Sequence, residues 1–212
     1  TITLLKRNKK LADSSRSQLL ELEDILEEYS DSLKEFEKAA EGYDKYIRYS
    51  EYQSQIILKL DKFISFNDLS ADYVSQERYD LALEQTKKAI VINDEMLEIR
   101  KNQHAMFAEE FTILERLLAE DEAYNENILM RKKELEVLVQ NPSIPSEQQF
   151  KKSDQLYEQY NAIFVEPNEY ASSIASWLDQ NIGQHVQKAN DIATSADIKY
   201  NSLKQKFYLT NK

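Results

Sequence analysis

Apolar and aromatic side chains recur near the amino end of the chain at alternating steps of four and three residues. The residues that follow this rhythm are Leu22, Leu26, Tyr29, Leu33, Phe36, Ala40, Tyr43 and Ile47, here called the amino-terminal seam. Such steps are typical of helices that pack side by side in heptads. The seam would be left in water unless another helix, of this chain or of a second chain, covers it.

The same rhythm returns twice further along the chain. It passes through His104, Phe107, Phe111, Leu114 and Leu118, and then through Ile182, Val186, Ala189, Ala193, Ala196, Tyr200, Leu203 and Phe207. Three seams of one period predict long helices that pack against each other.

Two stretches interrupt the helical pattern. Residues 66–70 (Phe-Asn-Asp-Leu-Ser) form a turn candidate, and residues 141–145 contain two prolines, which remove backbone donors and disfavour helix before them. The predicted helices are therefore about 3–65, 70–140 and 146–209.

Weaker features modify these helices. Pro167 predicts a kink or break near 165–168, and the polar residues Asp121 and Asn125 predict a bend within 120–127. Gly42 lies among seam residues, where it costs about 1 kcal/mol of helix propensity, but it would let a neighbouring helix approach closely.

The predicted fold class is all-α: an elongated antiparallel three-helix bundle or coiled coil with a kink or break in the third helix. Short connections favour antiparallel neighbours, and helices of this length span roughly 95–105 Å. At 212 residues, a single helical domain over 1–212 is expected.

Composition supports this class and excludes several chemistries. Two Gly and three Pro supply few turn residues for a sheet and no glycine-rich phosphate loop. The absence of Cys removes thiol catalysis, disulfides and cysteine metal sites. His104 and His185 are far apart and match no di-iron, zincin or EF-hand spacing, so we expect partly buried helix residues there, with no catalytic, cofactor-binding or metal residues and no enzyme activity.

A formal net charge of −11 disfavours nucleic-acid binding. Positive charge gathers only at Lys6, Arg7, Lys9 and Lys10, where we expect a solvated helix start or a tether. No apolar run approaches the ~20 residues of a membrane span, so membrane attachment is expected only through a lipid anchor outside this sequence.

Tyrosine is unusually common, with 13 residues in the chain. Tyr43, Tyr46, Tyr49 and Tyr52 recur every third residue and turn through half the helix circumference, so one seam cannot cover them all. Tyr43 belongs to the seam, whereas Tyr49 and Tyr52 should lie toward the flank or surface. The four tyrosines either line the edges of a thin bundle or form a partner-binding surface.

The run 200–208, Tyr-Asn-Ser-Leu-Lys-Gln-Lys-Phe-Tyr, resembles the Tyr-Asn-x-x-Lys-x-x-Phe-Tyr ending of the YkyA-like cell-wall-binding lipoprotein family of Gram-positive bacteria. Further diffuse similarity to that family involves Glu110, Phe111, Leu114, Tyr157, Tyr160 and Asn190. The resemblance implies a surface lipoprotein whose helical part stands at the cell wall, and it supplies no catalytic residues.

The resulting expectation is a non-enzymatic extracytoplasmic binding or spacer module, anchored to the membrane or associated with the cell wall. Its partner would be a wall polymer or another protein, although the negative charge opposes binding to anionic polymers. The alternative is an intracellular coiled-coil scaffold that binds a partner protein through its seams. A helical toxin or pore component is disfavoured, because the chain has no membrane-inserting apolar segment.

Overall fold

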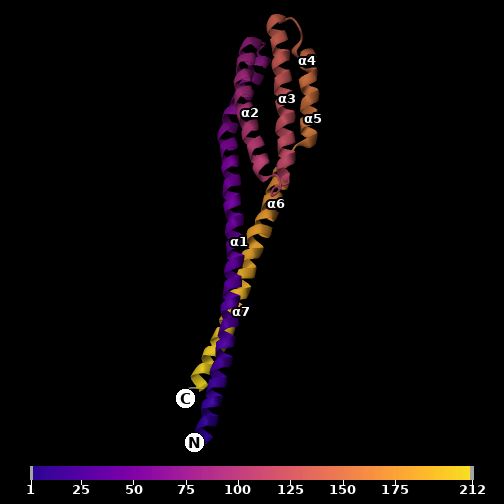
Figure 1. The fold of residues 1–212 in the computed structure, drawn as a ribbon. Helices are drawn as coiled ribbons and strands as arrows, with labels where there is room; N and C mark the ends of the chain where they lie inside the picture. Colours follow the sequence, from indigo (N-terminus) through magenta and orange to yellow (C-terminus); the bar gives the residue numbers. More distant parts are fainter. Residues whose placement is uncertain (1, 211–212) are drawn as a thin grey trace. The chain divides into compact units, whose positions relative to one another are not determined.

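The computed structural model describes the backbone of residues 2–210 and the side chains of residues 6 and 8–208. Regular structure in this part of the chain is entirely helical (Figure 1). The elements are α1 (Ile2–Ser75), α2 (Tyr79–Phe107), α3 (Ile113–Gln140), α4 (Ser146–Gln149), α5 (Lys151–Ile163), α6 (Pro167–Leu178), the π-helical turn η1 (Asp179–Gly183) and α7 (Gln184–Thr210). The predicted all-α class, with long helices packed against each other, is confirmed.

Contacts among the described residues divide the chain into two units. Unit 1 holds the described residues of Thr1–Lys45 and Leu178–Lys212, and unit 2 is Tyr46–Trp177. Helix α1 contributes its first part to unit 1 and its last part to unit 2. Each unit therefore has its own set of packed helices.

Prolines interrupt the helices where the sequence predicts. Helix α3 ends at Gln140, immediately before the 141–145 stretch, and α4 begins at Ser146. The third predicted helix breaks at 164–166, because Pro167 is the first residue of α6. Proline is well tolerated there, since the first turn of a helix has no use for its missing N–H.

The turn predicted at 66–70 is wrong, because α1 continues to Ser75. Packing explains the difference: the Ser70 hydroxyl lies 2.8 Å from that of Thr86 on α2 and is buried. The turn falls instead at Gln76–Arg78, where Glu77 has a φ of 57°. The N–H groups of Glu77 and Arg78 donate to the carbonyls of Val74 and Tyr73, which closes the helix in a Schellman arrangement.

The bend predicted within 120–127 is also misplaced, since the break between α2 and α3 lies at 108–112. Asp121 and Asn125 remain helical because both face polar partners on α2. Arg100 Nε donates to Asp121 Oδ2 at 2.8 Å, and Asn93 Nδ2 donates to Asn125 Oδ1 at 2.9 Å.

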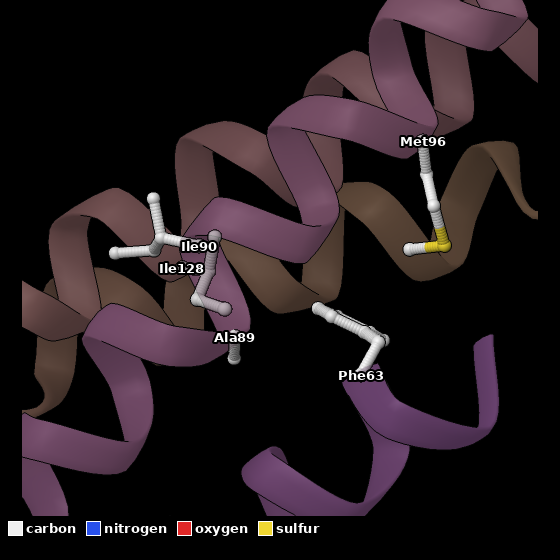
Figure 2. Packing of buried hydrophobic residues seen from close by; sticks show 5 residues of the cluster. All are labelled: Phe63, Ala89, Ile90, Met96 and Ile128. Carbon is white, nitrogen blue, oxygen red and sulfur yellow. The ribbon is translucent and has the colours of Figure 1, made fainter. Parts of the chain in front are cut away.

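Unit 2 is held together by apolar contacts among α1, α2, α3 and the helices after them. Figure 2 shows one cluster, in which Phe63 of α1 packs with residues of α2 and α3: Ala89, Ile90, Met96 and Ile128. A second cluster joins α2, α3 and the start of α5 through Tyr79, Ala82, Leu135, Leu138 and Phe150. Side chains from three or more helices thus share each core.

In unit 1, α7 packs on the first part of α1. Ile25 of α1 lies against Ala196 and Leu203 of α7. Further along, a Cβ built on Gly42 would lie 2.6 Å from the carbonyl oxygen of Asn181. The predicted role of Gly42 in a close helix approach is confirmed, because no other residue fits without a shift of the backbone.

Gly42→Ala should therefore destabilise the protein, although alanine is the better helix former. We expect a loss of about 1–3 kcal/mol in the free energy of unfolding, as for overpacked cores. Chemical denaturation of the intact chain, followed by circular dichroism, measures it. Gly183→Ala is the control, because its Cβ would meet only a movable Asp179 carboxylate at 3.1 Å. Equal stability of the two variants would contradict the close approach.

Candidate functional site

The amino-terminal seam lies largely open to solvent within unit 1. Leu26 is 58% exposed, Leu33 61% and Tyr43 55%. Together with Leu19 and Phe36 they form what we call the open face of α1. The requirement that another helix cover the seam is therefore not met by the described residues of unit 1.

A different face of α1 packs against α7. Its buried residues repeat every seven positions and are mostly small or polar: Ile25, Ser32, Glu35, Ala39 and Gly42. At 3.6 residues per turn, this face lies about 110° around the helix from the open face. Ser32 Oγ donates to the Ala189 carbonyl at 2.8 Å, so the covered face includes a specific polar contact.

Ion pairs line one edge of the α1–α7 contact. The Lys206 Nζ lies 2.9 Å from a carboxylate oxygen of Glu21, and the Lys188 Nζ lies 3.0 Å from one of Glu35. Between them, Lys199 pairs with Glu28. His185 Nδ1 lies 2.7 Å from the other oxygen of Glu35. His185 is thus a partly buried helix residue, as the sequence predicts.

The opposite edge is apolar and leads onto the open face. The Tyr29 hydroxyl donates a hydrogen bond to the carboxylate of Asp197 on α7. Beyond it, a groove of about 480 Å³ opens between the two helices. Its apolar lining consists of Leu19, Leu22, Tyr200, Leu203, Phe207 and Tyr208. One edge of this helix pair is therefore lined by ion pairs, whereas the groove at the other edge is mostly apolar.

Glu35 gives unit 1 a pH-dependent contact. Hydrogen bonds from Lys38, His185 and Lys188 lower the pKa of this carboxyl to about 2. Since the folded pKa lies below the ordinary value of 4.5, the stabilisation is complete above about pH 4.5 and is lost as the pH falls toward 2.

We therefore expect Glu35→Gln to flatten the pH dependence of stability between pH 4.5 and 2. Thermal unfolding of the two proteins at a series of pH values measures it. Glu41→Gln, at an exposed position of the same helix, should leave the slope unchanged. A wild-type slope retained in Glu35→Gln would contradict the assignment.

The four candidate tyrosines are divided between the two units. Tyr43 lies on the open face, whereas Tyr46, Tyr49 and Tyr52 belong to unit 2. Tyr49 is 1% exposed, so the expectation that it lies toward the surface is wrong. It continues the seven-residue repeat of the buried residues Glu35 and Gly42.

Tyr49 belongs instead to an aromatic cluster of unit 2. Its ring stacks on that of Phe111, with ring centroids 4.2 Å apart, and the Phe111 ring centroid lies 4.4 Å from that of Trp177. The Tyr49 hydroxyl lies 2.8 Å from that of Tyr170, and burial raises its pKa. Trp177 is itself buried, so the cluster is part of the core of unit 2.

Two carboxylates of α3, one buried and one half-buried, join helices of unit 2. Glu134 of α3 accepts hydrogen bonds from the N–H groups of Lys152 and Ser153 at the start of α5. Glu120 of α3 accepts one from the Val165 N–H at 2.9 Å, at the break before α6. These carboxylates bind otherwise unpaired backbone donors, which is a structural role.

Among the described residues, no group of three or more His, Asp or Glu is placed to hold a metal ion. No helix in that part of the chain is both long and apolar enough to span a bilayer. No protein-family model matches the sequence, and neither a curated protein nor a solved structure is detectably similar to it.

The sequence identified part of the candidate site. Leu26, Leu33, Phe36 and Tyr43 were predicted as a packing seam, and that pattern supplied the signal. Tyr200, Leu203 and Phe207 were likewise predicted as seam residues of a later helix, whereas Leu19 and Tyr208 belonged to no seam. Only the packing of α7 shows that these side chains lie beside the open face.

Proposed function

We propose that this protein is a non-enzymatic binding module that holds a helix of another protein against the open face of α1. The observation that carries the proposal is the exposure of Leu26, Leu33 and Tyr43, which recur at heptad spacing. A helix with the same period would cover them along its whole length.

The geometry favours a protein partner over a hydrophilic wall polymer, because the surface offered is apolar. Burying a large apolar side chain contributes about 1.5–3 kcal/mol, so five half-exposed residues offer roughly 4–7 kcal/mol before the cost of association. The partner's facing residues add a similar amount, and we expect micromolar affinity. The role suits both a cell-envelope protein and an intracellular scaffold.

A designed four-heptad peptide with leucine at both seam positions and neutral flanks tests the proposal. The chain has no cysteine, so Ser30→Cys can carry a polarity-sensitive dye beside the open face. We expect a saturable blue shift of the dye with this peptide. Asp24→Cys, on the opposite side of the helix, is the labelled control and should show no shift.

Leu26→Lys in the Ser30→Cys background should weaken binding at least about tenfold, because it places a charge in the apolar contact. If no saturable shift occurs, or if Leu26→Lys binds as well as the parent, the proposed function is wrong.

A further inference from the structure

The outer border of the open face is acidic. Glu23 and Glu37 lie four residues after Leu19 and Leu33, and Asp44 lies four residues after Ala40, so all three adjoin the open face on the helix surface. All three side chains are exposed. A helix docked on the open face would therefore run beside a row of carboxylates.

Few positive charges accompany the acidic border, and two of them are held by other carboxylates. Residues 17–45 contain three Lys or Arg against ten Asp or Glu. Lys34 lies three residues before Glu37, but its ammonium is bound to Asp31 at 2.7 Å, and that of Lys38 is bound to Glu35 at 2.9 Å. The α7 side of the groove carries one charged lining residue, the positive Lys204, beside Tyr200 and Phe207.

We infer that the partner of the open face is a cationic amphipathic helix, with Lys or Arg along the flank that faces Glu23 and Glu37. This inference rests on the proposed function and specifies the partner's chemistry. Opposite charges along the border speed association and fix the register of the docked helix, while the apolar contact supplies most of the affinity.

A second copy of this chain fits the face poorly. In an antiparallel pair of α1 helices, the acidic borders meet, and Glu23 of one copy lies near Glu37 of the other. In a parallel pair, each border would face the row of Ile25, Ser32 and Ala39, which α7 already covers. The meeting of like charges and the row already covered by α7 thus favour a basic helix of another protein over a second copy.

Three peptides with the same leucine seam test the inference on the intact protein by isothermal titration calorimetry. One has lysine flanks, one glutamate flanks and one neutral glutamine flanks. We expect the lysine peptide to bind at least about tenfold more tightly than the glutamate peptide at low salt, and the difference to shrink as salt is added.

The double variant Glu23→Gln with Glu37→Gln should reduce the preference for the lysine peptide over the glutamate peptide to about twofold. Its affinity for the neutral peptide should stay unchanged. The matched control, Asp24→Asn with Glu27→Gln, removes the same charge from exposed positions outside the acidic border and leaves the Asp31–Lys34 pair intact. It should keep most of the preference for the lysine peptide.

The alternative outcomes separate the two proposals. Equal binding of the lysine and glutamate peptides would overturn the cationic partner and leave helix docking standing, whereas binding of none of the three would overturn both. Sedimentation of the free protein should show a monomer. A dimer that Leu33→Lys dissociates would identify the occupant as a second copy and overturn the inference.

Discussion

Replacing Phe111 by alanine should lower the free energy of unfolding by about 3–5 kcal/mol, the range typical of large aromatic deletions in cores. Phe111 is 2% exposed, and its ring lies between those of Tyr49 and Trp177. It therefore joins α1, the α2–α3 break and α6. Denaturant unfolding, followed by circular dichroism and by the fluorescence of the only tryptophan, measures the loss.

Phe111→Leu is the matched control, because it keeps much of the volume and should cost less than about 1.5 kcal/mol. Its tryptophan emission should stay close to that of the wild type. If Phe111→Ala cost less than 1 kcal/mol, the aromatic cluster would not be a core of unit 2.

Replacing Arg100 by methionine should destabilise the protein by about 3 kcal/mol at pH 7, because it leaves the partly buried carboxylate of Asp121 without its cation. The Arg100 guanidinium is buried, with Nε 2.8 Å from Asp121 and Nη1 2.6 Å from Gln103. Lys101→Met is the control, since its pair with Glu122 is exposed and should contribute less than about 1 kcal/mol.

The loss of stability caused by Arg100→Met should also depend on pH. Burial raises the pKa of Asp121 above its usual 3.8, and Arg100 partly offsets that effect. Without Arg100 the folded pKa rises further, so the folded variant binds a proton that the unfolded chain does not. Its deficit should therefore shrink as the pH falls from 7 toward 4. A deficit that is constant over this range would contradict the role of the ion pair.

Features set by local backbone chemistry could be predicted from the sequence. The prolines at 142 and 145 end α3, and Pro167 begins α6, because proline acts on its own backbone. The turn expected at 66–70 failed for the opposite reason. Ser70 and Phe66 contact other helices, and those contacts keep α1 helical through a stretch with weak local preference.

The break at 108–112 could not have been found in this way. It contains no Gly or Pro, and it forms where Phe107 and Phe111 both turn into the aromatic cluster. Tyr49 was misplaced for a related reason, since its burial depends on rings supplied by distant parts of the chain. Such positions follow from tertiary packing rather than from periodicity.

In the candidate site, too, one part follows from the sequence pattern and the other from tertiary packing. Heptad spacing locates the apolar side of α1, but it does not say which neighbour covers that side. In unit 1, α7 packs on the face of α1 that holds Ser32 and Ala39, and η1 packs on Gly42. These small residues allow close contact, and the larger residues stay outside. The apolar pattern thus predicts the docking surface, whereas its exposure emerges only from the fold.

Thiol reactivity at two neighbouring positions of α1 tests this central claim most directly. The chain has no cysteine, so a single thiol can be introduced. Leu33→Cys places it on the open face, and Ser32→Cys places it against α7, with a side chain nearly the size of serine. In the free monomer, the thiol at 33 should react as fast as that of the exposed Asp24→Cys, and the thiol at 32 at least about a hundredfold more slowly. Protection of the thiol at 33 to the level of that at 32 would contradict an open face.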